Sequence, residues 1–186
     1  MVKVIGPKDQ RDSRAINCTS RSDNWSQGLS PFFLGPVKLY GGHVAKNVEN
    51  AWQYSKVYLV HTDASGDPGP DYFEWAQRGW DTDRAHRYPM GKGAKPQYSY
   101  WDGEKMTYIQ ARRKIYIPVY SAAVRKTDAF KILNGFYKAN GNEITLWDFD
   151  GYNHRELGLT WDQVIDSEER KCGHGFVLAM MLEGLL

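Results

Sequence analysis

A carboxylate, an amide and an amine occur at helical spacing between residues 47 and 58. Glu49, Gln53 and Lys56 stand at i, i+4 and i+7, so a helix here would place all three on one face. Trp52 follows Glu49 at i+3. These residue types suit a ligand site in which an acid acts and an aromatic ring stacks on the ligand. The same stripe also suits the solvated edge of an ordinary amphipathic helix, or a closed polar network in the core.

Two aspartates end an apolar run and form a second candidate group. Asp148 and Asp150 precede Gly151, a place where acidic side chains could belong to a site. Aspartate is also a common turn former, so both residues have a structural interpretation. His174 opens the last apolar segment, where its ring could contact a ligand, pack or cap a helix. No two histidines have helical metal-ligand spacing, and we predict no metal site.

The helices and strands that would position these residues indicate an α+β fold, mostly helical, with a few short strands. Helices are predicted over residues 47–61, 71–79, 104–116, 128–139, 161–165 and 173–185, and extended segments over 2–5, 31–40 and 143–149. Residues 81–102 are predicted to be a long basic and aromatic loop. Arg112, Arg113 and Lys114 are predicted to be the solvated face of a helix. One compact domain over residues 1–186 is expected from the length.

Composition restricts the class of protein only loosely. Aromatic residues make up 14% of the chain, so burial is expected to rely on large rings. The formal net charge of +2 neither requires nor excludes a nucleic-acid partner. Cys18 and Cys172 match no metal or redox spacing, which fits a reduced cytosolic protein. No signal peptide and no stretch long enough to span a bilayer is predicted.

Three segments of the first third resemble the NADAR (YbiA-like) superfamily. They are Leu29-Ser30-Pro31-Phe32-Phe33, then residues 35–41, and then residues 47–56, in which Glu49, Gln53 and Lys56 align with the glutamate, glutamine and lysine of that family. The resemblance is looser at residues 140–144, 148–151 and 173–182. Pro31, Asn50 and Gly175 stand where the family has asparagine, histidine and asparagine. The whole chain also resembles a small uncharacterised protein of T-even-like tailed phages.

The NADAR resemblance implies a YbiA-like domain and cleavage of an N-glycosidic bond. Substrates of that family include ribosylamino intermediates of the riboflavin pathway and ADP-ribose attached to guanine. The implied function is an N-glycosidase or ADP-ribosyl hydrolase acting on a nucleotide or modified nucleic acid, as a phage counter-defence activity. The implied catalytic residues are Glu49, Asp150 and Asp148, and the implied substrate-binding residues are Trp52, Gln53, Lys56, Phe33, Tyr152, His174, Arg87 and Lys92.

The alternative function is that of a catalytically inactive phage protein that binds a nucleotide, nucleic acid or host protein. Its binding surface would be the basic loop of residues 84–95, which could contact phosphates and stack on bases. Neither hypothesis requires a cofactor, and neither involves a membrane. The expected location is the cytoplasm of an infected host cell.

Overall fold

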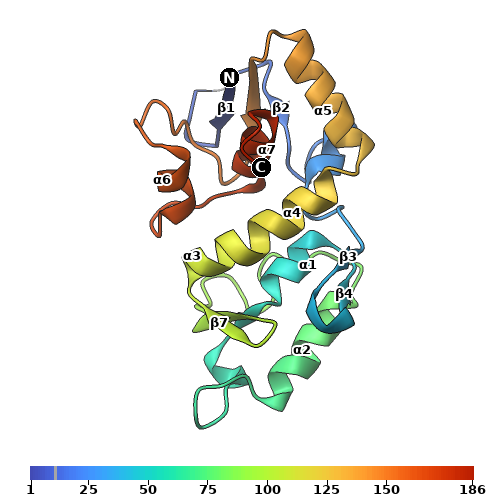
Figure 1. Ribbon diagram of the computed structural model, residues 1–186, viewed down its shortest axis with the longest axis vertical. Helices are drawn as coiled ribbons and strands as arrows, with labels where there is room; N and C mark the ends of the chain where they lie inside the picture. Colours follow the sequence, from blue (N-terminus) through green and yellow to red (C-terminus); the bar gives the residue numbers. More distant parts are fainter. Residues whose placement is uncertain (11) are drawn as a thin grey trace. The chain divides into compact units, whose positions relative to one another are not determined.

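The computed structural model describes residues 1–10 and 12–186, and it confirms an α+β fold (Figure 1). The chain divides into two compact units. Unit 1 comprises Met1–Phe33 and Tyr120–Leu186, and unit 2 comprises Leu34–Val119. In the described part of the chain, every helix is too short or too polar to cross a membrane.

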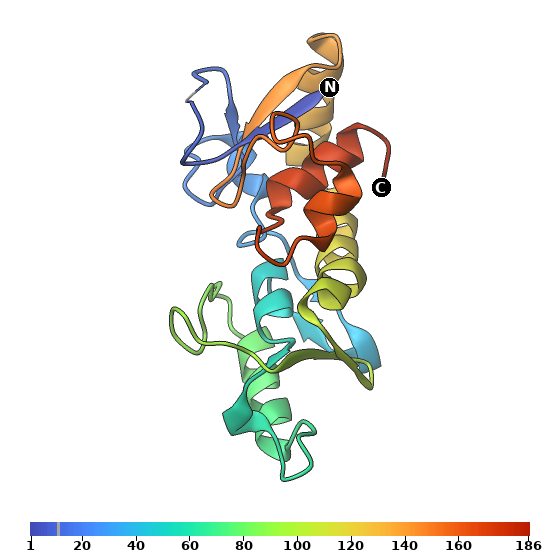
Figure 2. The same ribbon diagram turned by 90° about the vertical axis from the view of Figure 1, so that its left-hand side faces the viewer.

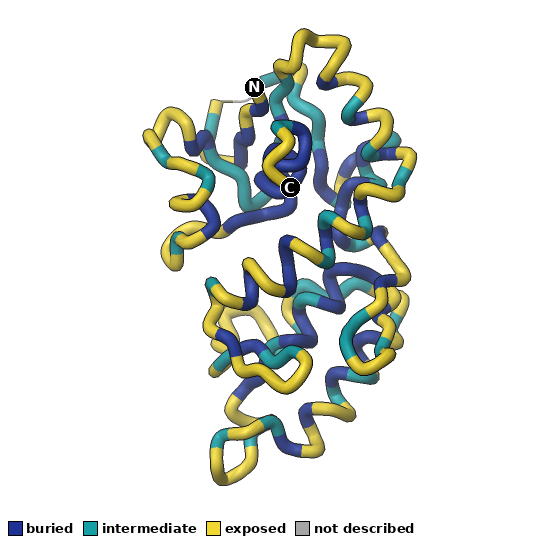
Figure 3. Tube along the Cα trace, in the orientation of Figure 1, coloured by how far each residue is buried: buried dark blue, intermediate teal, exposed yellow. Residues whose placement is uncertain are grey.

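Unit 1 is built on a three-stranded parallel sheet. The central strand β8 (Ile144–Trp147) lies between β1 (Val2–Ile5) and β2 (Ile16–Asn17). Helix α7 (His174–Leu182) packs on β1 and β8 and is buried along its whole length (Figure 3). A helix that is apolar all round must be buried, so α7 forms the core of this unit. The strands and the last helix that the sequence predicts here are confirmed.

Helix termini in unit 1 follow from local capping residues. Helix α5 (Asp128–Ala139) begins after Thr127, whose side chain accepts a hydrogen bond from the Phe130 N–H. Helix α6 (Trp161–Asp166) begins with a complete capping box between Thr160 and Gln163. A short 3₁₀ helix, η1 (Trp25–Leu29), contacts α5. The predictions of helices over 128–139 and 161–165 are therefore confirmed.

Unit 2 contains two small antiparallel sheets and short helices. Its elements in chain order are β3 (Val37–Lys38), η2 (Tyr40–Gly42), β4 (Val44–Ala45), α1 (Val48–Gln53), β5 (Lys56–Val57), η3 (Leu59–His61), α2 (Pro70–Trp80), β6 (Tyr98–Trp101), β7 (Glu104–Met106) and α3 (Tyr108–Ala111). Strand β6 lies between β5 and β7. The prediction of a helix over 47–61 is wrong beyond Gln53, because the next residues pair with β6 and the Ser55 hydroxyl bonds to the Trp52 carbonyl.

A β-hairpin replaces the end of the predicted long loop. Strands β6 and β7 are joined by Asp102 and Gly103, which have φ angles of 49° and 85°. Two positive φ angles in a two-residue connection are typical of a type I′ hairpin turn. The prediction of a helix from Glu104 is therefore wrong, since the helix begins only after Thr107, where a capping box with Gln110 starts α3.

A π-helical turn follows α3, over Arg112–Tyr116, and leads into α4 (Ile117–Val124), in which the boundary between the units falls. The Ile117 N–H bonds to the Arg112 carbonyl, five residues back. Pro118 has no N–H to donate, and its ring crowds the carbonyl four residues earlier. A wider turn relieves this crowding, so Pro118 accounts for the π turn inside a continuous helical run.

Gly79 allows α1 and α2 to approach closely. A Cβ atom at this position would overlap the ring of Tyr54. We expect Gly79→Ala to destabilise the fold by about 1–3 kcal/mol, since the ring has to move. Gly135→Ala is the matched control in α5, where a Cβ would meet open space, and it should stabilise by roughly 0.5–1 kcal/mol. Urea unfolding of both variants measures the two effects, and equal signs would contradict this interpretation.

His154 should make the fold less stable in acid. Burial lowers the pKa of His154, nearby Arg155 lowers it further, and Glu183 partly opposes the shift. A lowered pKa means that the unfolded chain takes up a proton first as the pH falls. The stabilising contribution is therefore present above about pH 6.5 and is lost as the pH falls below it. We expect His154→Gln to lose less unfolding free energy than wild type between pH 7.5 and 5.5, and an equal or larger loss would refute this origin.

Candidate functional site

Glu49, Gln53 and Lys56 form a chain of hydrogen bonds in unit 2. The Gln53 Nε2 donates to the Glu49 Oε1 at 2.9 Å, and the Lys56 Nζ donates to the Gln53 Oε1 at 2.7 Å. Glu49 and Gln53 are only 6% and 8% exposed. Lys56 belongs to β5 and not to the helix, so the predicted helical face is wrong at this residue although the contact is present. The direction of the amide is fixed, because the ammonium can only donate and the amide NH₂ then faces the carboxylate.

Aromatic rings and a second cation lie beside this chain. The Lys56 Nζ is 4.9 Å from the centre of the Trp52 ring, and Trp52 contacts Tyr116 at 5.3 Å and Tyr108 at 6.2 Å between ring centres. The Arg112 guanidinium lies 4.6 Å from the Tyr108 ring centre. Arg112 is 1% exposed, so the prediction that it belongs to a solvated face is wrong. A buried carboxylate, two cations and an aromatic wall thus belong to one unit.

Two asparagines of the same segment fix the loop after α2. The Asn50 Nδ2 donates to the carbonyls of Thr82 and Arg84 at 3.0 Å, and its Oδ1 accepts the His86 N–H at 2.9 Å. Asn47 caps α1 and also donates to the Asp83 carbonyl. The sequence-based interpretation missed this role of Asn50, which is fully buried. The sequence signal for this role is a polar residue at an inward-facing helix position, because a buried polar side chain must find hydrogen-bond partners.

Tyr54 connects α1 to the same loop. Its hydroxyl lies 2.7 Å from the His86 Nδ1, and its ring packs on Trp75 at 4.5 Å between ring centres. Burial raises the pKa of Tyr54. The ring therefore packs between protein groups, which leaves Trp52 as the more suitable stacking residue on α1.

The basic loop of residues 84–95 is attached to α1 through Arg84 and His86, and the rest of the loop extends away from α1 and α2 (Figure 2). Arg84, Lys92 and Lys95 are exposed, and Arg87 lies 5.6 Å from the Tyr88 ring centre. Residues 84–97 include four Lys or Arg side chains and no carboxylate. Phosphate groups are suitable ligands for such a loop, because it carries several cations and no carboxylate that would compete for them.

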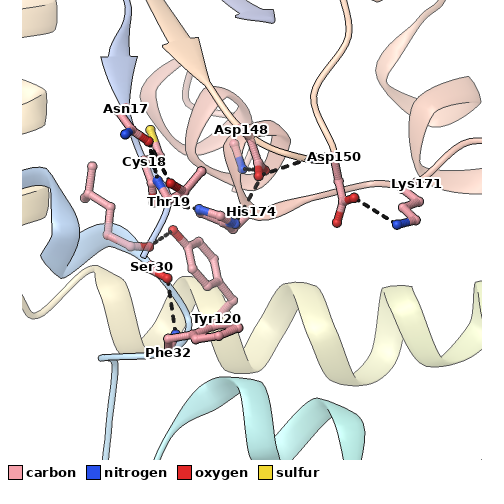
Figure 4. A network of polar contacts seen from close by, with 12 residues as sticks. Asn17, Cys18, Thr19, Ser30, Phe32, Tyr120, Asp148, Asp150, Lys171 and His174 are labelled. Atoms are coloured by element: carbon pink, nitrogen blue, oxygen red, sulfur yellow. Dashed lines mark hydrogen bonds and ion pairs between the residues drawn. The ribbon is translucent and has the colours of Figure 1, made fainter. Parts of the chain in front are cut away.

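In unit 1, the Asp148 side chain is surrounded by protein donors (Figure 4). Its Oδ2 accepts the Gly175 N–H at 2.8 Å, and its Oδ1 accepts the Asp150 N–H at 3.4 Å. The residue is 2% exposed. Gly173 and Gly175 leave the room that the carboxylate needs, because a Cβ at either position would meet Asp148. Asp148 therefore serves as a cap for the N-terminus of α7.

His174 has both ring nitrogens next to acceptors. The Nε2 lies 2.8 Å from the Cys18 carbonyl oxygen, and the Nδ1 lies 3.4 Å from the Asp148 Oδ2 (Figure 4). A carbonyl only accepts, so the Nε2 carries a hydrogen and donates it to the Cys18 carbonyl. Both ring nitrogens therefore face buried protein groups. These contacts favour the structural interpretation of His174 over contact with a ligand.

Asp150 differs from Asp148 in its access to solvent. Its Oδ1 pairs with the Lys171 Nζ at 3.0 Å, and 26% of its side chain is exposed. Of the two aspartates, Asp150 is the one that a substrate could reach.

Two other predicted substrate-binding residues of unit 1 differ in their surroundings. The Tyr152 ring packs on Phe176 at 4.6 Å between ring centres. Phe33, in contrast, is 56% exposed.

The predicted site residues fall into two groups. Unit 2 holds Glu49, Trp52, Gln53, Lys56, Arg87 and Lys92, whereas unit 1 holds Phe33, Asp148, Asp150, Tyr152 and His174. Direct contacts join Glu49, Trp52, Gln53 and Lys56 in unit 2. In unit 1, a separate network joins Asp148 to His174. Across residues 1–10 and 12–186, no three His, Cys, Asp or Glu side chains are grouped so that they could hold a metal ion.

Comparison with protein families places most of the chain in one group. Residues 7–156 match the model of DUF6939, a family of unknown function. No curated protein and no solved structure matches the chain.

Proposed function

The chain belongs to the DUF6939 family of unknown function, and from the residues around Glu49 we propose that it is an N-glycosidase or ADP-ribosyl hydrolase acting on a nucleotide or modified nucleic acid. The observation that carries the proposal is the buried Glu49 carboxylate, held by Gln53 and Lys56 beside Trp52. The resemblance of residues 29–41 and 47–56 to the NADAR superfamily supports it, and with it a YbiA-like arrangement of these segments. The resemblance to a phage protein supports a counter-defence role in the cytoplasm of an infected cell.

The proposed reaction is hydrolysis of the bond between a sugar and a base. The C–N bond breaks, the oxygen of a water molecule bonds to the sugar carbon, and the released base takes up a proton. Positive charge develops on the sugar in the transition state. A carboxylate that is already oriented stabilises this charge without reorganising, which is the role that we give to Glu49.

The remaining residues have supporting roles in this proposal. Trp52 stacks on the base, and Lys56 holds the Gln53 amide that orients Glu49. Arg87 and Lys92 contact phosphates from the loop. Asp148 and Asp150 belong to unit 1, whereas Glu49, Trp52 and Lys56 belong to unit 2, so the proposal rests on the residues of unit 2.

The test uses the purified full chain and two substrates. One is a DNA oligonucleotide that carries ADP-ribose on guanine, and the other is a ribosylaminopyrimidine phosphate. Mass spectrometry should detect ADP-ribose released from the oligonucleotide, or the free pyrimidine released from the second substrate, with one oxygen from labelled water in the released sugar. The proposal is wrong if neither substrate is cleaved while the oligonucleotide is bound. Binding of the oligonucleotide that weakens steeply with salt would then support the non-enzymatic alternative.

A further inference from the structure

Tyr108 is a half-exposed ring that has a buried cation next to it. It is the first residue of α3, and the capping box of Thr107 and Gln110 fixes the backbone there. Tyr108 is 43% exposed, whereas Arg112, whose guanidinium lies 4.6 Å from the ring centre, is 1% exposed. An aromatic ring that rests on a fixed cation is held in one orientation while much of its surface stays open.

This ring belongs to the same set of contacts as Glu49. Tyr108 contacts Trp52, and Trp52 lies under the Lys56 ammonium. Lys56 leads through the Gln53 amide to the Glu49 carboxylate. All of these residues are in unit 2, where α1 and α3 are neighbours (Figure 1). Tyr108 therefore extends the aromatic wall beyond the residue that the sequence suggests.

We propose that Tyr108 is the stacking residue for the base of a nucleoside phosphate bound at this site, with Trp52 beside it. The inference rests on the proposed function for the place of the ligand next to Glu49. Two rings between two cations favour a ligand that is both planar and anionic. The apolar cluster of Met106, Ala111 and Ile115 buries part of Trp52 but leaves Tyr108 exposed, so core packing does not account for the ring.

The experiment compares two ligands that differ only in the base. Adenosine 5′-monophosphate and ribose 5-phosphate carry the same phosphate, and calorimetric titration of the full chain measures both affinities. We expect Tyr108→Ala to weaken binding of the nucleotide by about 5- to 150-fold, because stacking of one base contributes that much. Binding of ribose 5-phosphate should not change. Tyr108→Phe should keep the affinity, and Phe73→Ala, which removes a ring with 44% exposure elsewhere in the unit, should have no effect.

Three results of the titration would overturn the inference. They are no nucleotide binding by wild type, equal affinity for the nucleotide and the sugar phosphate, and unchanged nucleotide affinity in Tyr108→Ala. A failure of the proposed function would give different results. Nucleotide binding that depends on Tyr108, without cleavage of either substrate, would refute only the reaction. Cleavage with an unchanged KM in Tyr108→Ala would refute only the stacking role.

Discussion

Glu49→Gln should lower kcat for the ADP-ribosyl or ribosylamino substrate by about 10²- to 10³-fold, the usual cost of removing one preorganised electrostatic group. Glutamine has the same shape, and its carbonyl oxygen can still accept the hydrogen bond from the Gln53 Nε2. The variant should therefore fold and keep its KM within a small factor. A fall in kcat at constant KM is the signature of a group that acts in the transition state.

The control is another glutamate of the same unit. Glu74 is exposed on α2 and pairs with Arg78 at 3.6 Å, so Glu74→Gln should leave kcat unchanged. Circular dichroism and urea unfolding should show that both variants keep the wild-type fold. If Glu49→Gln retains full turnover, Glu49 does not stabilise the transition state, and the polar chain of Glu49, Gln53 and Lys56 is a structural network.

The sequence predicts the elements whose pattern is set locally. The β-branched residues of β1, the Thr127 cap and the almost wholly apolar α7 identify these elements without knowledge of their neighbours. One failure lies where tertiary contacts decide. The helix begun at Val48 stops at Gln53, because pairing of Lys56 and Val57 with β6 competes with helix formation. The β6–β7 hairpin is a failure of another kind, since its aromatic residues and its Asp-Gly pair are a strong local hairpin signal.

The candidate site shows the same division. Spacing along α1 predicts that Glu49 and Gln53 meet, and the contact to Lys56 survives the change of element because its long side chain reaches back. Tyr108 could not be placed beside Trp52 from spacing, since its position depends on how α3 packs against α1. The burial of Arg112 is likewise not predictable from its place in a run of three basic residues.

Asp148→Ala should lower the unfolding free energy by about 1–3 kcal/mol, the range for leaving a buried hydrogen-bond donor unsatisfied. The change removes the acceptor for the Gly175 N–H at the start of α7 and the contact with the His174 Nδ1. Both losses fall on the helix that forms the core of unit 1. Asp148→Asn should cost less, because its amide oxygen can still cap the helix although the charge is gone. Urea unfolding followed by circular dichroism measures these differences.

A double-mutant cycle separates the contact with His174 from the cap. Asp148→Ala combined with His174→Leu should be less destabilising than the sum of the single changes, because the two side chains are in contact. Asp128→Ala is the matched control, since its exposed pair with Lys131 should change stability little. Additive single changes would mean that Asp148 stabilises unit 1 through the cap of α7 alone. That result would show that the contact with His174 contributes nothing to the stability of the core.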